Sequence, residues 1–501
     1  MARQRYWPEA IHHEDNLSHM GLRTPQQYIE SIRDDRTVYY RGERVPDVTT
    51  HPVIKKAVHH AALDFEMAED PQYRDLAVVE EAGDRYSRYY KLPASNEDLL
   101  KRSQLIEAAT ALGKTLVVLV KEIGTDALFA LHKVAPQVDR KYETGYAGRV
   151  RAFYRHCRDN DLAISVAQTD VKGDRSAGPQ NQPHPDYYTR IVERRDDGIV
   201  VRGAKIHTSC TTNVNELIVL PTRAMTEADR DYAVAFAIPV NTPGVKLVAS
   251  PYGGSPKSEF DAPLSADRKM METITIFDDV FVPWERVFLA GEHDFAAAIA
   301  LGFVEYHRFT AVSYKLPLVD ALIGSALLMA DINGISRAAH VRDKLIWLIS
   351  YAETLRALTE MAAIRGAADD QGIFAPDALT TNMAKYHFAH HYHEALQHVQ
   401  DIAGGMLVTG PGVEDFANPE TGDLLRKYLG GRAGVDGEVR TRAMNMVSDL
   451  TTGDFGGYHA VLAIHAEGSL EAEKLMISRA YDSRRTLEYA KQLAGIQGGS
   501  P

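Results

Sequence analysis

Residues 161–221 decide the fold of this chain; they read DLAISVAQTD VKGDRSAGPQ NQPHPDYYTR IVERRDDGIV VRGAKIHTSC TTNVNELIVL P. Runs 188–193 and 199–206 are rich in β-branched side chains and flank the turn-forming residues 194–198, which is the pattern of a β-hairpin. Residues 215–220 add a third strand-like run. We therefore predict a small antiparallel β-domain inside a chain whose two ends are helical.

Helical signals lie on both sides of this stretch. Thr24 precedes Pro25, which is a common way to begin a helix, and long amphipathic runs follow the β-domain. Strand-like runs at residues 232–239 and 272–277 extend the β-region. We predict an α+β chain of three domains: an N-terminal α-helical domain at residues 1–158, a central antiparallel β-barrel at residues 159–291, and a C-terminal helical bundle and oligomerisation domain at residues 292–501.

The composition is that of an ordinary globular protein, with 45% hydrophobic and 25% charged residues among 501. A formal net charge of -12 argues against nucleic-acid and anionic-membrane partners, which need a positive surface. The two cysteines are too few for a disulfide framework. Residues 1–20 lack the apolar core of a signal peptide, and no apolar run is long enough to span a membrane. We expect a cytoplasmic protein.

Several motifs resemble those of a known family. They are Asn160-Asp161-Leu162, Thr169-Asp170, Gly173-Asp174-Arg175-Ser176, Arg202-Gly203-Ala204-Lys205 with Thr208, residues 277–286, and residues 401–405. Together they resemble the flavin-binding pattern of the 4-hydroxyphenylacetate 3-hydroxylase superfamily, and the likeness covers nearly the whole chain. The predicted order of domains is also that of the acyl-CoA dehydrogenase-like flavoproteins, so the resemblance implies that fold.

The resemblance implies that FAD is the cofactor and indicates which residues would hold it. They are Gln168, Lys172, Asp174, Arg175, Lys205 and Thr208, with Thr452, Gly453 and Asp454 from late in the chain. A guanidinium such as that of Arg175 offers fixed paired donors for a diphosphate. Without the resemblance, residues 172–176 are a charged turn, and the Thr208 hydroxyl bonds only to backbone.

One branch of the superfamily contains the 4-hydroxybutyryl-CoA dehydratases, which hold an iron-sulfur cluster with three cysteines and one histidine. His307 matches the histidine, but Val118, Glu122 and Tyr314 stand at the cysteine positions. Because a cluster requires thiolates or close substitutes, we expect neither an iron-sulfur cluster nor another metal.

The other branch contains hydroxylases that use reduced FAD and oxygen. Their phenol-binding motif corresponds to residues 122–127, which lack its arginine and tyrosine, and Val166 stands where a histidine is expected. Residues 449–457 still resemble the C-terminal flavin segment of this branch. The resemblance therefore implies a substrate other than 4-hydroxyphenylacetate.

The resemblance places four residues at the candidate active site: His307, Arg308, Tyr314 and Glu272. A neutral imidazole can move a proton near pH 7, so His307 is a candidate base, and Tyr314 could donate a proton. The alternatives are a structural histidine, a packed tyrosine and, for Glu272, an exposed carboxylate at a strand edge. A further group is interpreted as a solvated or interface helix face rather than a metal site, because no motif accompanies it: His387, His390, His391, His393 and His398.

We expect a two-component monooxygenase that acts on a small organic substrate, aromatic or carrier-bound, with FADH2 supplied by a separate reductase. The long C-terminal helices indicate a homotetramer. One alternative is a cluster-free isomerase, dehydratase or desaturase of an acyl-CoA or acyl-carrier substrate, with His307 as base. The other is a flavin-binding scaffold without activity, since two sets of family residues have been replaced.

Overall fold

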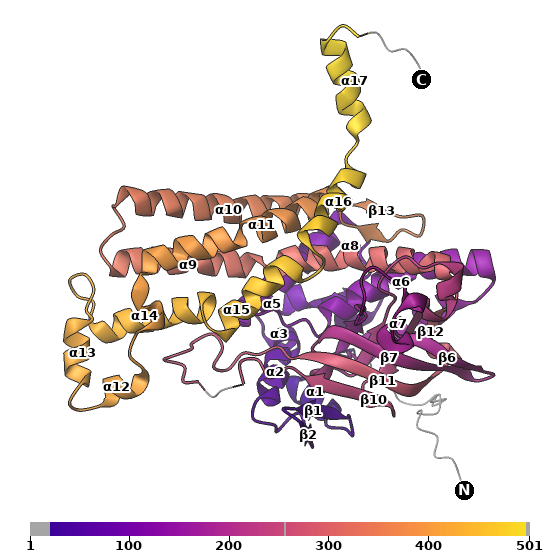
Figure 1. The fold of residues 1–501 in the computed structure, drawn as a ribbon, viewed down its shortest axis with the longest axis horizontal. Coiled ribbons are helices and arrows are strands. Elements are labelled where there is room, and N and C mark those ends of the chain that lie inside the picture. The colour runs from indigo at the N-terminus through magenta and orange to yellow at the C-terminus, as the bar shows by residue number, and fades with distance from the viewer. Residues whose placement is uncertain (1–20, 255–256, 497–501) are drawn as a thin grey trace.

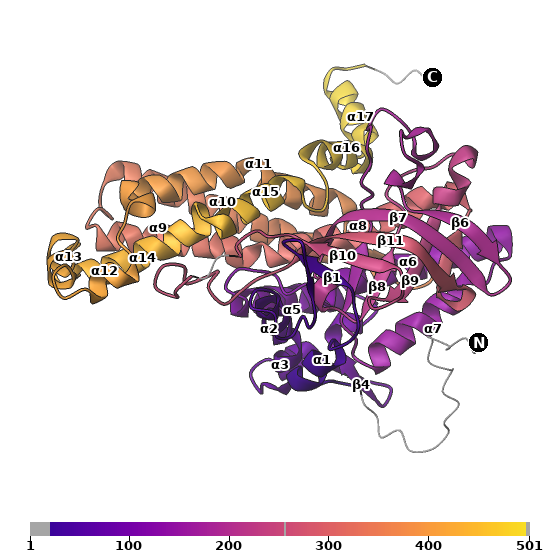
Figure 2. The same cartoon turned by 60° about the horizontal axis from the view of Figure 1, so that its bottom comes forward.

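The computed structural model describes residues 21–254 and 257–496 (Figure 1). The N-terminal helices lie beside a β-region, and a long bundle of C-terminal helices extends to one side of both (Figures 1 and 2). The predicted order of helical part, β-region and helical bundle is confirmed, whereas the domain limits near residues 158 and 291 stay a prediction. Residues 1–20, for which the sequence predicts no signal peptide, lie outside the described part. Within the described part, no helix is long and apolar enough to cross a membrane.

The N-terminal part is mainly helical, as predicted. Thr24 caps the first helix, because its hydroxyl accepts a bond from the Gln27 amide while the Gln27 side chain accepts from the Thr24 amide. The helices are α1 (Pro25–Ser31), α2 (Ile54–Ala61), α3 (Leu63–Glu69), α4 (Arg74–Ala77), α5 (Asn96–Leu112), α6 (Glu122–Tyr142) and α7 (Tyr146–Asp159). Four short strands lie between them: β1 (Val38–Tyr40), β2 (Glu43–Val45), β3 (Val78–Glu81) and β4 (Asp84–Ser87).

The β-region contains the predicted hairpin. Its two strands are β6 (Arg190–Arg195) and β7 (Gly198–Ser209), which pair antiparallel from Arg195 opposite Gly198 onward. The other strands are β5 (Ile164–Ala167), β8 (Glu216–Val219), β9 (Val234–Pro239), β10 (Val245–Ala249), β11 (Glu272–Pro283) and β12 (Val287–Ala290). The predicted strand runs at 215–220, 232–239 and 272–277 thus each contain a strand.

The predicted antiparallel β-barrel is wrong. The strands of the β-region form two open sheets, one in the order β2-β1-β10-β11-β7-β6, which includes two strands of the N-terminal part, and one in the order β12-β9-β8-β5. The remaining described strands form the two-stranded sheets β3-β4 and β13-β14. The two larger sheets meet where Phe236 of β9 packs against Phe277 of β11, with ring centroids 5.8 Å apart, as in a sandwich. Two pairings, β1 with β10 and β5 with β8, are parallel. Strand periodicity indicates that strands exist, but the choice of partner depends on contacts between distant segments, which explains the error.

The C-terminal part is a bundle of long helices. They are α8 (Ala296–Tyr314), α9 (Leu316–Ile332), α10 (Ala339–Ile364), α11 (Ala378–Ala403), α12 (Val413–Ala417), α13 (Gly422–Tyr428), α14 (Gly437–Thr451), α15 (Asp454–His465), α16 (Leu470–Ala480) and α17 (Ser483–Leu493), with the short strands β13 (Ala367–Ala368) and β14 (Phe374–Ala375) after α10. Helix α8 also contacts α5 and α6 of the N-terminal part. The bundle is therefore continuous with the first helices, and α8 lies at the centre of the molecule.

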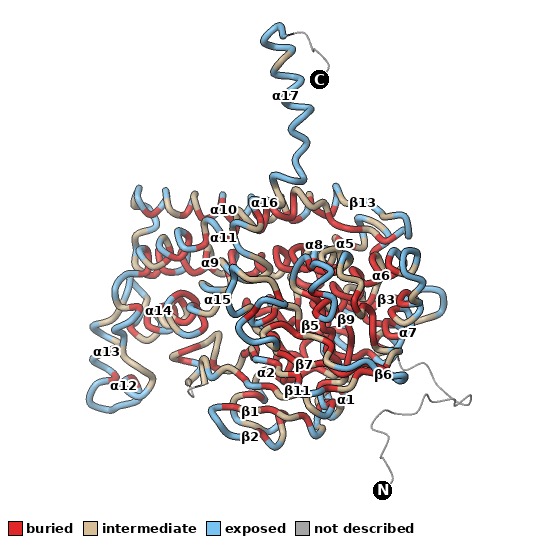
Figure 3. The backbone as a smooth tube through the Cα atoms, turned by 45° about the vertical axis from the view of Figure 1, so that its right-hand side comes forward, coloured by how far each residue is buried: buried red, intermediate tan, exposed pale blue. Residues whose placement is uncertain are grey.

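Burial separates the central part of the molecule from its last helix. Buried residues fill the sheets and the inner faces of the bundle, whereas α17 projects from the body and contains no buried residue (Figures 1 and 3). The sequence pattern predicts one helix over residues 469–493, but the chain breaks it near Tyr481 into α16 and α17. The candidate site described next lies where β7, β11, α8, α15 and α16 come together.

Candidate functional site

A loop with nearby cations follows strand β5. Lys172 in this loop is half-buried, and Arg175 and Arg223 are exposed. Burial lowers the pKa of the Lys172 ammonium, Arg175 and Arg223 lower it further, and Asp170 opposes this shift, so both guanidinium groups are close enough to repel Lys172. A bound anion would relieve this repulsion. The loop therefore fits the diphosphate of FAD, with Arg223 as a contributor that the sequence interpretation did not include.

Asp170 and Lys205 form the base of this loop. The Lys205 Nζ lies 2.8 Å from an Asp170 carboxylate oxygen, 2.8 Å from the Gln168 carbonyl and 2.9 Å from the Leu220 carbonyl. An ammonium group has three donors, and all three are used here. In contrast to the prediction, Lys205 holds the loop in place and has no donor left for a cofactor. The Gln168 side chain donates to the Ala300 carbonyl of α8 at 3.3 Å, so it links the loop to the bundle.

Gly173 and Asp174 give the loop its shape. Gly173 has a φ of +51°, and a Cβ there would lie 2.3 Å from the ring of Tyr187, so a larger residue would displace the loop. The exposed Asp174 carboxylate accepts bonds from the amide and hydroxyl of Ser176, and Gln182 braces the backbone on both sides of Asp174. Asp174 therefore organises the turn, since a carboxylate would repel a diphosphate.

Thr208 belongs to a buried cluster of threonines on β7 and β11. Its hydroxyl lies 2.6 Å from the Thr273 hydroxyl and 2.7 Å from the Thr275 hydroxyl, and it donates to the Thr273 carbonyl at 3.0 Å. Thr211 adds a 2.6 Å bond to Thr273. Because Thr208 is fully buried and its hydrogen bonds are satisfied within the protein, it serves the interior of the sheet rather than an open cofactor surface.

Thr452, Gly453 and Asp454 lie where α14 ends and α15 begins. Gly453 is next to the Lys257 side chain. Burial lowers the pKa of Lys269 to about 8, and the charge of Asp454 opposes this shift, which shows that these two side chains are neighbours. The three predicted residues therefore form a second polar surface with Lys257 and Lys269.

Glu272 is half-buried at the start of β11. Its carboxylate accepts a 2.7 Å bond from the Tyr458 hydroxyl of α15 and 3.0 Å bonds from the Ser209 hydroxyl of β7. Burial raises the pKa of Glu272 to about 6, although both hydroxyl bonds lower it. The alternative of an exposed carboxylate at a strand edge is wrong. A carboxyl group that titrates near neutral pH can serve as a general acid or base.

His307 lies on the buried face of α8. Its Nδ1 is 3.2 Å from a carboxylate oxygen of Asp126, which also pairs with Arg102 at 2.8 Å. An ionised carboxylate only accepts hydrogen bonds, so Nδ1 carries the hydrogen and Nε2 is left as the basic atom. The ring stacks on Phe303, with centroids 4.9 Å apart. Asp126 therefore orients His307 for the role of a base.

Tyr314 ends α8 within a charged network. Its hydroxyl donates to Glu467, whose other carboxylate oxygen lies 3.0 Å from the Lys315 Nζ and 3.8 Å from the Lys385 Nζ. Burial raises the pKa of Glu467, but Lys315 and Lys385 outweigh it and bring the pKa to about 2. Burial likewise lowers the pKa of Lys315 to about 8, against the opposite effect of Glu467. Tyr314 is thus bonded to an ionised carboxylate rather than simply packed.

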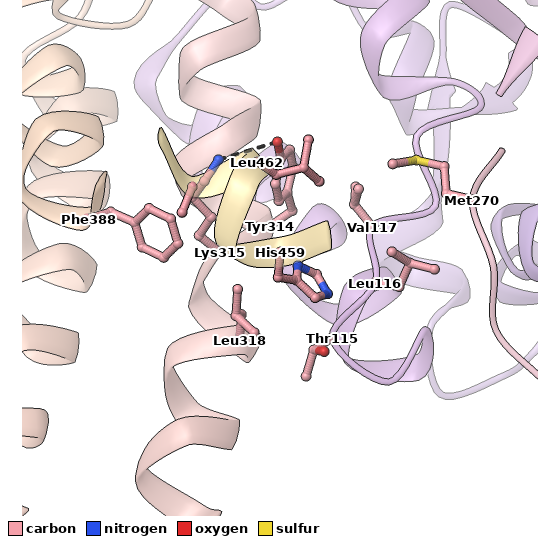
Figure 4. Close-up of a pocket in the computed structure, with 11 residues that line it drawn as sticks. Thr115, Leu116, Val117, Met270, Tyr314, Lys315, Leu318, Phe388, His459 and Leu462 are labelled. Carbon is pink, nitrogen blue, oxygen red and sulfur yellow. Dashed lines mark hydrogen bonds between the residues drawn. The ribbon is translucent and has the colours of Figure 1, made fainter. Parts of the chain in front are cut away.

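Figure 4 shows the cavity beside this network. Tyr314 and Lys315 lie on one side, His459 of α15 on another, and Met270 faces them from before β11. A 3.3 Å bond joins the Lys315 Nζ to the Tyr314 hydroxyl (Figure 4). The cavity has a volume of about 20 Å³, which is room for roughly one water molecule. A larger group could enter only if these side chains moved apart.

Arg308 turns to a different part of the bundle. Its Nε donates to the Glu467 carbonyl at 2.9 Å, and its Nη1 donates to Asn382 of α11. Arg308 does not line the cavity of Figure 4. The structure therefore brings His307, Tyr314 and Glu272 to neighbouring networks and places Arg308 on the far side of Glu467.

The histidines of α11 contact aromatic and backbone groups, and in the described part of the chain no group of three or more possible metal ligands is present. His387 bonds to the Tyr351 carbonyl at 3.1 Å, while His391 and His398 pack edge-on against Trp347 of α10. This arrangement agrees with a helix face that is partly open to solvent.

Sequence interpretation missed most of the partners of the predicted residues. Lys315 offered a signal, because it stands in a largely apolar run where a lysine is seldom buried without a partner. Glu467 lies in a connection between α15 and α16, and Tyr458 resembles any aromatic residue of a buried helix. No local pattern distinguishes these two.

Two family models match the chain. One, described as 4-hydroxyphenylacetate 3-hydroxylase N terminal, covers residues 24–289, and the other, described as 4-hydroxyphenylacetate 3-hydroxylase C terminal, covers residues 296–495. The 4-hydroxybutyryl-CoA dehydratase/vinylacetyl-CoA-Delta-isomerase of Clostridium aminobutyricum is 35% identical over 95% of this chain and 100% of its own length. The 4-hydroxyphenylacetate 3-monooxygenase oxygenase component of Thermus thermophilus is 32% identical over 87% of this chain and 89% of its own.

Solved structures give the same two likenesses. An oxygen-tolerant archaeal 4-hydroxybutyryl-CoA dehydratase from N. maritimus superposes with a TM-score of 0.90 at 32% identity, covering 96% of each chain. The oxygenase component of a 4-hydroxyphenylacetate 3-monooxygenase, complexed with FAD, superposes with a TM-score of 0.86 at 29% identity, covering 94% of this chain and 98% of the other.

Proposed function

The chain belongs to the 4-hydroxyphenylacetate 3-hydroxylase family, and on this premise we propose that it is the FAD-dependent oxygenase component of a two-component monooxygenase. We favour the monooxygenase branch because of the bond from Tyr314 to Glu467. Tyr314 stands where the resemblance implies a cysteine ligand of the dehydratase cluster. The Tyr314 phenol is hydrogen-bonded to a carboxylate of the protein and thus has a partner without a metal. The monooxygenase relative from Thermus thermophilus supports the same reading.

FAD would be bound through its diphosphate by Lys172, Arg175 and Arg223, because an anion would relieve the repulsion of Lys172 by the two arginines. Asp170 and Lys205 keep this loop in position. When bound in reduced form, FAD would supply the electrons for oxygen transfer to substrate, and a separate reductase would provide the FADH2.

The protein's own side chains would handle protons and exclude water. His307 is oriented by Asp126 so that Nε2 can accept a proton from the substrate. Glu272 can exchange a proton near neutral pH, because its pKa is about 6. The narrow cavity beside Tyr314 and Lys315 admits little water, which favours oxygen transfer over wasteful peroxide release.

The substrate is proposed to be a small organic molecule, aromatic or carrier-bound, other than 4-hydroxyphenylacetate. Glu122 to Ala127 replace the phenol-binding motif, and in the structure these residues are buried at the start of α6. Val166, in place of a histidine, is also buried in β5. The residues that bind a phenol in the family are therefore replaced by residues that are buried in the protein interior.

We further propose a cytoplasmic homotetramer. Apolar side chains are exposed on α9, α10 and α17: Leu327, Leu328, Ile346, Ile349, Leu487 and Leu493. An FAD that lies between two copies of the chain would contact the cationic loop of one copy and the polar group at the start of α15 of the other. This would give Thr452, Gly453 and Asp454 their predicted role.

A second candidate is a cluster-free isomerase or dehydratase of an acyl-CoA or acyl-carrier substrate. The relative from Clostridium aminobutyricum is 35% identical, and two observations favour this activity. Glu272 has a pKa of about 6, and the Nδ1 of His307 contacts Asp126 at 3.2 Å, which orients the ring so that Nε2 is the atom available for proton transfer. Two proton-transfer groups near one site suit the movement of a double bond.

One pair of experiments separates the candidates. The purified protein is mixed with FADH2 and air, and the return of the oxidised flavin spectrum and the yield of hydrogen peroxide are followed in a stopped-flow instrument. Delayed return with little peroxide supports the monooxygenase, whereas immediate return with stoichiometric peroxide contradicts it. Anaerobic conversion of vinylacetyl-CoA to crotonyl-CoA would instead support the isomerase. Failure to bind either form of FAD would leave the scaffold.

A further inference from the structure

A second cavity lies between helices α8, α11 and α16, and it shares no lining residue with the cavity of Figure 4. Its volume is about 160 Å³. Leu301 and Val304 of α8, Ala378 of α11 and Met476 of α16 form apolar walls, and Glu305 of α8 also lines the cavity. Leu301 is 48% exposed, so the cavity is open to solvent on that side. An engineered protein cavity of roughly 150 Å³ holds benzene, so this cavity has room for a small organic molecule.

A buried cation lies at one end of this cavity. Arg308 is 4% exposed, and its guanidinium donates to two neutral oxygens, the Glu467 carbonyl and the Asn382 side chain. In residues 21–254 and 257–496, no carboxylate oxygen forms an ion pair with Arg308. Buried charges in proteins are normally paired, because removal of an unpaired charge from water is costly. The charges of Glu473 and Glu467 act on Arg308 from nearby, but its guanidinium makes no direct contact with a carboxylate oxygen, so an anion could still bind to it directly.

A second donor lines the same cavity. The Thr381 hydroxyl is buried, the residue being 1% exposed, and within the described residues this oxygen has no hydrogen-bond partner. Buried polar groups without a partner are rare and call for an explanation. A ligand oxygen placed between Thr381 and Arg308 would satisfy both.

The surrounding charges also leave room for one negative group. Glu305 of the cavity lining is neutralised by Lys133, whose Nζ lies 2.7 Å from its carboxylate. Of the remaining charges, Arg308, Lys315 and Lys385 are positive, while Glu467 and Glu473 carry at most two negative charges. Lys385 is shared between these two carboxylates, at 3.8 Å from Glu467 and 3.6 Å from Glu473. One bound anion of single charge would make this buried group neutral.

We propose that this cavity binds a small monocarboxylate, with the carboxylate against Arg308 and Thr381 and an apolar body of about the size of a benzene ring among Leu301, Val304 and Met476. Glu467 joins this site to the candidate active site, because its carbonyl accepts from Arg308 while its carboxylate accepts from Tyr314. The site is made by the chain's own residues and does not depend on the proposed flavin chemistry.

The test is a titration of the full-length protein with 4-fluorobenzoate, followed by fluorine NMR, with and without FAD. We expect saturable binding with one ligand per chain. The uncharged analogue 4-fluorobenzamide should bind at least about tenfold more weakly, because it lacks the charge that Arg308 attracts. Absence of saturation at millimolar ligand, or equal affinity for the two compounds, would overturn the proposal.

Three variants locate the site, and a fourth is the control. Thr381→Val removes the hydroxyl at nearly constant shape and should weaken binding about three- to tenfold. Ala378→Leu fills the cavity and should abolish binding, and Arg308→Gln should weaken it at least tenfold. Thr359→Val changes a buried threonine of α10 that bonds to the Leu355 carbonyl and should leave affinity unchanged. Affinity retained in Ala378→Leu would place the ligand elsewhere and reject the site, and circular dichroism checks that each variant is folded.

Discussion

Buried polar groups are paired differently on the two sides of the candidate site, the sheet side formed by β7 and β11 and the helix side formed by the helices around Glu467. On strands β7 and β11, neutral hydroxyls satisfy one another, as in the contacts of Thr208 with Thr273 and Thr275. The ion pair of Asp170 and Lys205 likewise has its donors filled. On the helix side, Lys315 and Lys385 share Glu467 at 3.0 and 3.8 Å, and more cations than carboxylates are present.

This difference suggests that the sheet side supports a cofactor, whereas the helix side provides the groups that can react. A fully satisfied polar network rigidifies its surroundings, which suits a surface that must hold a cofactor in one position. A network of shifted pKa values and incomplete pairing can exchange protons or bind an anion. The two sides meet at Glu272, because this residue of β11 receives its shortest bond from Tyr458 of α15. Four substitutions would break or sharpen this contrast.

The largest effect is expected on the sheet side. Lys205→Met leaves the Asp170 carboxylate buried without its cation, so the free energy of unfolding should fall by about 3–5 kcal/mol. Urea denaturation followed by circular dichroism measures the loss. Lys246→Met is the matched control, because Lys246 pairs with Asp278 on the surface with 42% of its side chain exposed, and it should cost less than about 1 kcal/mol. Equal losses in both variants would show that the pair does not hold the loop.

The next largest effect is expected at Glu272, where the two sides meet, and concerns the pH dependence of stability. Glu272 has a pKa raised from 4.5 to about 6, so the folded protein binds this proton more tightly than the unfolded chain does. The free energy of unfolding should therefore fall by about 2 kcal/mol as pH rises from 4.5 through 6. Glu272→Gln removes this loss. The variant should be more stable than the parent by up to about 2 kcal/mol at pH 8 and show no gain at pH 4.

Denaturation of both proteins at the two pH values checks this prediction. A gain in stability of the same size at pH 4 and pH 8 would contradict the prediction, because it would mean that the folded protein does not raise the pKa of Glu272. Loss of activity in the more stable variant would identify the carboxylate as a group kept for function rather than for stability.

A smaller effect is expected at the cationic loop. Arg175→Ala should weaken FAD binding by about tenfold, because a charge-assisted bond to the diphosphate is lost. Equilibrium titration with fluorescence of free FAD measures the affinity. Arg195→Ala serves as control, since Arg195 is exposed in the hairpin and pairs with Glu193 at 2.7 Å. Wild-type affinity in Arg175→Ala would remove this residue from the site.

The smallest effect concerns the bond between the two sides. Tyr458→Phe removes a hydroxyl that lowers the pKa of Glu272, so the pKa should rise further above 6 by about 0.5–1 unit. The midpoint of the pH dependence of stability reports this shift. Tyr252→Phe is the control, because Tyr252 stacks on Tyr458 but donates its hydroxyl to the Met270 carbonyl. A shift in the control alone would assign the pKa to packing.

Local features of the fold could be predicted from the sequence because their causes are local. Thr24 and Pro25 mark a helix start through residues only a few positions apart, and the capping bonds to Gln27 are present. The hairpin of β6 and β7 follows from alternation and a turn of adjacent residues. The resemblance to the family likewise rests on short motifs, and the matching family models cover residues 24–289 and 296–495.

The tertiary structure alone decided which side chains act together. Glu272 and Tyr458 are 186 positions apart, and His307 and Asp126 are 181 apart. The position of Lys205 in a flavin motif suggested a cofactor ligand. In the structure, its three donors are instead bonded to three oxygens of the protein. A sequence determines the pattern of strands, helices and caps through neighbours along the chain. Burial, pairing and pKa arise from neighbours in space, so the open sheets, the charged network around Glu467 and the raised pKa of Glu272 became visible only in the folded protein.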